Sequence, residues 1–141
     1  MDLGLTNKKA LVTGSSRGLG YATALALAKE GCRVAINGRD EARIKAVAER
    51  IQKETGTQAI GLEGDVSQPE VPAKLVAQTV EAFGGLDILI TNAGGPPPGP
   101  FESHDDANWQ KGIDLSLMSH VRLIRAALPH LKRSSAACVL T

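Results

Sequence analysis

The sequence is poor in aromatic residues and in net charge. Its 141 residues include one Trp, one Tyr and two Phe, and 16 Lys or Arg against 15 Asp or Glu leave a formal net charge of +1. A nucleic-acid interface needs a basic surface and rings on which bases stack, so we expect no nucleic-acid partner. The longest apolar runs, such as 86–90 with Asp87 inside it, fall short of the roughly 20 residues that cross a bilayer, which predicts no membrane span.

The chain is also poor in cysteine and carries no pattern typical of secretion. Cys32 and Cys138 form no Cys-x-x-Cys pair, which argues against a disulfide framework and a structural zinc site. We therefore expect no metal and predict that both cysteines are small core residues. No apolar segment follows Lys8 and Lys9 before the glycine-rich stretch 14–18, so no signal peptide is predicted and a cytoplasmic protein is expected.

Short aliphatic runs alternate with longer stretches of helical periodicity along the whole chain. The predicted strands are 10–13, 33–37, 58–62, 86–91 and 138–141. The predicted helices are 19–30, a helix begun by Asp40, one that runs from a capping box at 67–70 to Phe83, and a long segment over 105–132. Strands joined by helices form a parallel sheet with right-handed crossovers. The pattern thus predicts an α/β fold, a Rossmann-type doubly wound parallel sheet with helices on both faces.

A glycine-rich loop follows the first predicted strand. Its glycines let the backbone turn tightly, and the N-terminus of the next helix offers free N–H groups to an anion. A phosphate site is therefore predicted from Gly14, Ser16, Arg17, Gly18, Leu19 and Gly20. A tight turn without a ligand is the alternative.

Two other motifs are weaker matches to the same loop. The stretch 14–18 fits the G-x-S-x-G pattern, which would make Ser16 a hydrolase nucleophile, but the three histidines lie at or within the long helical segment rather than on later loops. The P-loop pattern fails because no Gly-Lys-Ser/Thr follows at the required spacing.

The end of the second strand bears on the choice of cofactor. In dinucleotide sites an acid at this point bonds the ribose 2′-hydroxyl, whereas arginine accommodates a 2′-phosphate. This chain has Asn37 and Arg39 there, and Arg17 and Arg39 could converge on one phosphate. NADP(H) is therefore favoured over NAD(H). An S-adenosylmethionine site is disfavoured, because its ribose diol would also require a carboxylate at this position. The alternative is that both arginines are solvated surface charges.

Three motifs on successive loops resemble the short-chain dehydrogenase/reductase family. They are Thr13-Gly14-x-x-x-Gly18-x-Gly20, Gly64-Asp65-Val66 and Thr91-Asn92-Ala93-Gly94. The resemblance implies that Asp65 and Val66 hold adenine, unless 64–66 is a plain turn, and that Asn92, Ala93 and Gly94 lead the cofactor toward the nicotinamide site, with Asn92 bracing its strand. It implies an NAD(P)(H)-dependent oxidoreductase that interconverts an alcohol and a carbonyl in a small-molecule substrate. A non-catalytic NADP(H)-binding protein is the alternative.

The chain departs from the family in two ways. Asp114 stands where the family usually has a catalytic Asn; it is our catalytic candidate, although an ionised Asp only accepts hydrogen bonds, and a surface residue near Lys111 is the alternative. The family's Ser and Tyr-x-x-x-Lys are missing, so the resemblance places them beyond Thr141. We therefore expect residues 1–141 to form one NADP(H)-binding domain, C-terminally incomplete and cut off at the fifth strand, and to be inactive alone.

Two further segments are expected to meet substrate or partner. The loop 94–100 holds four of the seven prolines and is predicted to be either a stiff wall of the substrate pocket or a rigid connector. The helical segment 105–132 is apolar on more than one face, with one stripe formed by Ile113, Leu117, Val121, Ile124, Leu128 and Leu131. We expect the sheet to cover one face and a second subunit of a homodimer or homotetramer to cover the other. A later part of the chain is the alternative cover.

Overall fold

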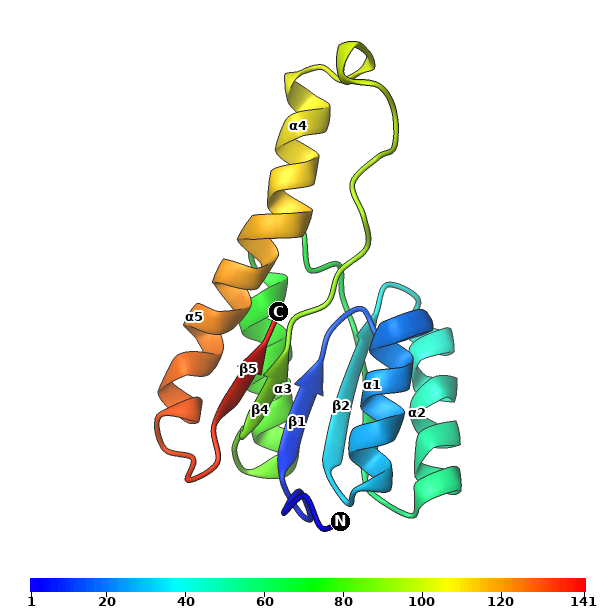
Figure 1. Ribbon diagram of the computed structural model, residues 1–141, viewed down its shortest axis with the longest axis vertical. Helices are drawn as coiled ribbons and strands as arrows, with labels where there is room; N and C mark the ends of the chain where they lie inside the picture. The colour runs from blue at the N-terminus through cyan, green and yellow to red at the C-terminus, as the bar shows by residue number, and fades with distance from the viewer.

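The computed structural model describes residues 1–141 as five parallel strands with connecting helices (Figure 1). The strands are β1 (Lys9–Val12), β2 (Arg33–Gly38), β3 (Ala59–Glu63), β4 (Ile88–Ile90) and β5 (Cys138–Leu140). The helices are α1 (Gly18–Lys29), α2 (Glu41–Thr55), α3 (Val71–Phe83), α4 (Asp106–Ile113) and α5 (Ser119–Leu131), with a 3-10 turn η1 (Phe101–Ser103) and a π-helical turn η2 (Asp114–Met118). The strand order β3-β2-β1-β4-β5 confirms the predicted doubly wound sheet. Its topological switch point lies between β1 and β4, where such folds bind ligands.

The sheet is covered by helices on both faces. Ala10 and Val12 of β1 pack with buried residues of α1 and α2, whereas Leu11 packs with buried residues of α3 and α5. This alternation follows from the two-residue period of a strand. Because β1 is buried on both faces after Lys9, its remaining three residues are all apolar.

Three helix ends follow local sequence signals, and one predicted helix start does not. The side chain of Asp40 caps α2 by accepting from the Arg43 N–H at 2.9 Å, and α2 and α3 end at glycines with left-handed backbone. The predicted capping box at 67–70 is wrong. Helix α3 begins after Glu70, whose side chain makes no cap bond, because residues 65–67 form a local turn in which the N–H and the hydroxyl of Ser67 both donate to Asp65 Oδ1. Short polar side chains often form such local bonds in place of a cap.

The long helical segment consists of α4, η2 and α5, and α4 extends beyond the sheet together with the loop that precedes it (Figure 1). The predicted apolar stripe is a packing face only in part. Its Leu131 is buried with Leu123 and Ala127 of the same helix, and its Ile124 packs against that core, whereas its Ile113 and Leu117 are 42% and 56% exposed. The wider π-helical turn shifts the helical phase, so residues before and after it do not share one face. The homo-oligomer expected through this segment stays a prediction.

The two cysteines lie in different surroundings. Cys32 is buried, as predicted, but Cys138 is exposed. Within residues 1–141 the prediction for Cys138 is wrong, because β5 is the edge strand of this sheet and all three of its residues are exposed. None of the helices combines the length and the apolar character needed to span a bilayer.

Candidate functional site

A cavity of about 400 Å³ lies at the carboxyl ends of the strands. It is lined by residues of the loops that follow β1, β2, β3 and β4, joined by Leu115 of η2. The structure thereby brings together all of the predicted binding residues except Gly20. Those in the lining are Gly14, Ser16, Arg17, Gly18, Leu19, Asn37, Arg39, Asp65, Val66, Asn92, Ala93 and Gly94.

The glycine loop packs too closely against its neighbours to accept side chains at two positions. A Cβ on Gly14, whose φ is +56°, would lie 2.7 Å from the Asn92 carbonyl oxygen. A Cβ on the buried Gly20 would collide with the Gly14 carbonyl oxygen, which explains why Gly20 supports the loop without lining the cavity. Both glycines let the start of α1 approach the ends of β1 and β4.

The start of α1 presents unpaired N–H groups to the cavity. Arg17 precedes the helix in extended conformation, no side chain caps the helix, and its first turn contains no acid. The first N–H groups of a helix have no partner within the helix and lie at the positive end of its dipole. Together with Gly18 and Leu19 in the lining, this end of α1 is suited to bind an anion.

Asn37 holds three strand ends together. It is buried, its Oδ1 accepts from the Gly14 N–H at 3.2 Å, and its Nδ2 donates to the carbonyl oxygens of Leu62 and Gly64 at 3.2 and 3.0 Å. Both donors of the amide are therefore engaged within the protein. The side chain of Asn37 therefore stabilises the site. Contacts to a ligand at the rim of the cavity are left to other residues.

Sequence reasoning missed two further bracing side chains, Thr13 and Ser15. The Ser15 hydroxyl donates to the Val12 carbonyl at 2.6 Å and accepts from the Asn37 N–H at 2.9 Å. The Thr13 hydroxyl donates to the Asn92 carbonyl at 2.8 Å and accepts from the Asn92 N–H at 3.0 Å. Asn92 in turn donates from Nδ2 to the Gly14 carbonyl at 2.9 Å. The position of Thr13 and Ser15 directly after a buried strand was the only available signal for them.

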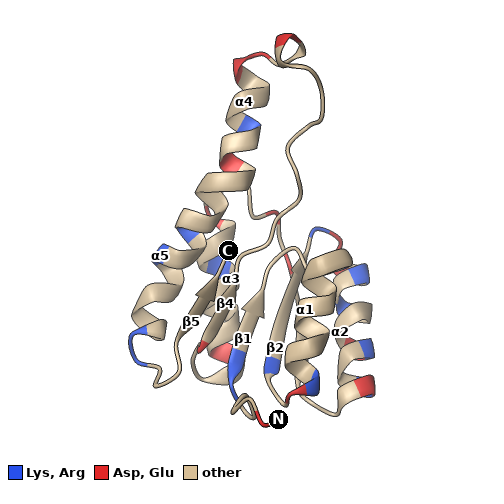
Figure 2. Ribbon diagram, viewed as in Figure 1, with Lys and Arg blue, Asp and Glu red and all other residues tan.

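At the rim, two charged side chains have no protein partner, and a third uses only one of its two oxygens. The guanidinium groups of Arg17 and Arg39 are exposed and take part in no hydrogen bond or ion pair. Asp65 accepts from the Ser67 N–H and hydroxyl through Oδ1 alone, at 3.0 and 2.8 Å, and its Oδ2 has no partner. Acidic and basic residues are interspersed along α2 and α4 (Figure 2).

The hydrolase interpretation of Ser16 finds no support in the geometry. A serine nucleophile needs a base within hydrogen-bond reach, and no histidine lines the cavity. His120 is hydrogen-bonded instead to the Thr91 hydroxyl, with 2.7 Å between Nδ1 and Oγ1.

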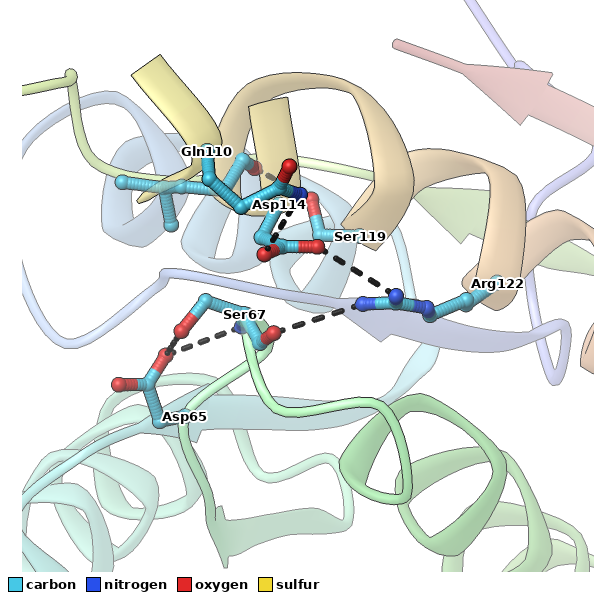
Figure 3. Close-up of polar contacts among 7 residues, drawn as sticks. Asp65, Ser67, Gln110, Asp114, Ser119 and Arg122 are labelled. Carbon is cyan, nitrogen blue, oxygen red and sulfur yellow. Dashed lines mark hydrogen bonds and ion pairs between the residues drawn. The ribbon is translucent and has the colours of Figure 1, made fainter. Parts of the chain in front are cut away.

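Asp114 lies beside the cavity but does not line it. Its carboxylate accepts from Gln110 Nε2 at 3.2 Å through Oδ2 and from Arg122 Nη2 at 3.4 Å through Oδ1 (Figure 3). Leu115, one residue further on, lines the cavity in its place. A direct catalytic role for Asp114 stays a prediction.

A second, mostly apolar cavity of about 410 Å³ adjoins the first. It lies between the proline-rich loop and the α4–η2 segment, and Pro96 and Ser116 in its lining directly follow Gly95 and Leu115 of the first cavity. The complete lining is Pro96, Pro97, His104, Asn108, Trp109, Gly112, Ile113, Ser116 and Leu117. The proline-rich loop thus forms the wall of a cavity.

The family of the chain follows from comparison with known proteins. Residues 8–141 match the family model described as short chain dehydrogenase. Together with the parallel sheet and the glycine loop at its switch point, this match shows that the chain belongs to the short-chain dehydrogenase family.

Relatives of known function and structure agree with this assignment. The chain is 47% identical over 95 residues to glucose 1-dehydrogenase of Gluconobacter oxydans (strain 621H), an alignment that covers 67% of this chain and 36% of the relative. L-Sorbose reductase of Gluconobacter frateurii, solved with NADPH and L-sorbose, superposes with a TM-score of 0.94 at 32% identity, over 99% of this chain and 53% of that one. The NADH-dependent reductase A1-R′, solved with NAD, gives 0.90 at 33% identity, over 99% and 60% of the two chains. The chain thus spans between a third and three fifths of the length of these relatives.

Proposed function

We propose that the chain forms the cofactor-binding part of an NADP(H)-dependent oxidoreductase that interconverts an alcohol and a carbonyl. The observation that carries this proposal is the pair of unpartnered guanidinium groups, Arg17 and Arg39, at the rim of a cavity whose floor is the glycine loop. A 2′-phosphate is recognised well by the planar fork of arginine. The only polar side chain of β2 in the cavity is Asn37, which is buried and already engaged, so β2 offers no carboxylate to a ribose diol.

The remaining residues of the cavity fit the other parts of the dinucleotide. The cradle at Gly14, which a Cβ would fill, and the free start of α1 suit the pyrophosphate. Asp65, with Oδ2 unpaired, suits the exocyclic amine of adenine, and Ala93 and Gly94 leave room for close approach after β4. The cofactor supplies the hydride in this chemistry, and the chain's own residues bind and orient it.

Relatives support a nucleotide cofactor and show why its identity needs a test. L-Sorbose reductase was solved with NADPH, whereas reductase A1-R′ is described as NADH-dependent. The chain has no Tyr-x-x-x-Lys sequence, so residues 1–141 alone are expected to bind cofactor without reducing a carbonyl. The adjoining apolar cavity is the proposed place of the carbonyl substrate.

Replacing Arg39 by alanine tests the cofactor preference. Loss of a charged hydrogen bond should weaken NADPH binding by about 1.5–3 kcal/mol, which is roughly 10- to 150-fold in Kd, and leave NADH binding unchanged. Fluorescence titration with both cofactors measures the two constants. Arg43→Ala is the matched control, since Arg43 lies four residues further on, in the first turn of α2, and does not line the cavity. Equal losses for NADPH and NADH would refute the proposed preference.

A further inference from the structure

We propose that Arg122 is a positioning residue for the adenine end of the cofactor. It links the η2 turn of the long helical segment to the loop that carries Asp65 (Figure 3). This inference rests on the proposed function, because it assigns Arg122 to the site of the same dinucleotide. Nothing in the sequence pattern marks Arg122, which does not line the cavity.

The guanidinium of Arg122 is held from two sides. Nη1 donates to the Ser67 carbonyl oxygen and Nη2 to Asp114 Oδ1, each at 3.4 Å, and Gln110 holds the other carboxylate oxygen of Asp114. The side chains of Arg122 and Asp114 are only 19% and 29% exposed, so their pairing is less screened than a surface ion pair. The rigid fork of arginine is suited to such a bridge between two elements.

The bridge reaches Asp65 through Ser67. Both the N–H and the hydroxyl of Ser67 donate to Asp65 Oδ1, and in Figure 3 the other carboxylate oxygen points away from Ser67. A carboxylate fixed through one oxygen presents the other as an acceptor in a defined direction. Arg122 therefore sets the direction of Asp65 Oδ2 by fixing Ser67, without touching the cofactor.

The loop that carries Asp65 is also held by an apolar contact, so the effect of removing Arg122 should be confined to this loop. Val66, between Asp65 and Ser67, is buried in the core with Leu75 and Val76 of α3. Removing Arg122 should therefore loosen the polar side of the loop while the apolar side stays packed. We expect a loss of affinity for the adenine half of the cofactor and not a global loss of folding.

Binding of the two halves of NADPH separates a positioning role from a structural one. The probes are 2′,5′-ADP, which contains the adenine half, and reduced nicotinamide mononucleotide, which lacks it, both titrated by calorimetry. Arg122→Met should raise the Kd of 2′,5′-ADP about tenfold and leave that of the mononucleotide unchanged. Arg122→Lys, which can keep one of the two bonds, should restore part of the affinity. Arg125→Met is the matched control, since Arg125 is exposed on the same helix.

Two further variants protect the test against misfolding. Ser67→Ala removes the hydroxyl bond to Asp65 alone and should weaken 2′,5′-ADP in the same direction but less. In a double-mutant cycle, Arg122→Met and Asp65→Asn should be non-additive, because the first acts through the second. Additive losses would overturn the inference.

The outcomes distinguish this inference from the proposed function. If Arg122→Met binds 2′,5′-ADP like the parent protein, or loses both probes equally, Arg122 has no positioning role while the proposed function stands. If the parent protein binds neither probe, the proposed function is refuted and this inference with it.

Discussion

Alanine should destabilise the protein at Gly20 and stabilise it at Gly112, although both glycines lie within α-helices. A Cβ on Gly20 would meet Asn92 Nδ2 at 2.8 Å and the Ser15 Cα at 2.9 Å, and would collide with the Gly14 carbonyl oxygen. A Cβ on Gly112 would meet only the Pro96 Cβ, at an ordinary contact distance of 3.4 Å. Both substitutions therefore gain the higher helix propensity of alanine. They differ in the space available to the new methyl group.

The magnitudes follow from three terms. Alanine in a helix is favoured over glycine by about 1 kcal/mol. At Gly20 the collision with backbone atoms should cost roughly 1–3 kcal/mol, and displacement of Asn92 from the Gly14 carbonyl about 1 kcal/mol more. The net effect expected is a loss of about 1–3 kcal/mol at Gly20, and at Gly112 a gain of about 0.5–1 kcal/mol.

Urea unfolding followed by far-ultraviolet circular dichroism measures both changes. The midpoint should move to lower urea for Gly20→Ala and to higher urea for Gly112→Ala, with the slope m unchanged, because the surface exposed on unfolding stays the same. A Gly20→Ala protein as stable as the parent would show that the glycine loop and the end of β4 do not pack as closely as the structure has them. If the urea midpoint moved in the same direction by the same amount in both variants, the space around each glycine would not determine the effect of the substitution.

The other predictions concern helix caps and a buried thiol. Asp40→Ala removes the acceptor for the Arg43 N–H and should cost about 1 kcal/mol in urea unfolding, whereas Glu70→Ala, where the side chain makes no cap bond, should stay within about 0.5 kcal/mol of the parent. Burial, with a smaller effect of Asp87, raises the pKa of the Cys32 thiol from its usual 9.0 to about 11. The unfolded chain therefore loses this proton first, so the free energy of unfolding should fall as the pH rises from 9 to 11. Cys32→Ala should show a smaller fall in the same titration, and an equal fall would contradict the assignment.

The sheet and the glycine loop could be predicted because their signals are local. Aliphatic runs and helical periodicity give the order of the elements, and parallel pairing then places every loop that follows a strand at one edge. Gly14, Asp65 and Asn92 are far apart in the chain, yet they meet in one cavity for this reason. Grouping of the site residues thus required no knowledge of side-chain contacts.

The contacts that organise the site could not be predicted in the same way. The bond from Arg122 to Ser67 spans 55 residues and that from Thr13 to Asn92 spans 79, and neither depends on a repeating pattern. The capping box failed because the N–H and the hydroxyl of Ser67 both donate to Asp65 in a local turn, and the sequence does not show that this turn replaces the first turn of the helix. The π-helical turn at Asp114–Met118 is likewise invisible in the spacing of apolar residues.

The polar groups of the cavity divide into two sets, and the two sets should respond differently to substitution. The amides of Asn37 and Asn92 and the hydroxyls of Thr13 and Ser15 bond to the protein itself. The groups left without partners are two guanidiniums, one carboxylate oxygen and the first N–H groups of α1. This second set is complementary to a ligand that is anionic at two points and carries a hydrogen-bond donor at a third, as the proposed NADP(H) would be. If NADP(H) binds as proposed, substitutions in the first set should weaken every cofactor alike. Substitution of Asp65 should do the same, because adenine is common to NAD and NADP, whereas substitutions of Arg17 and Arg39 should discriminate between the two cofactors.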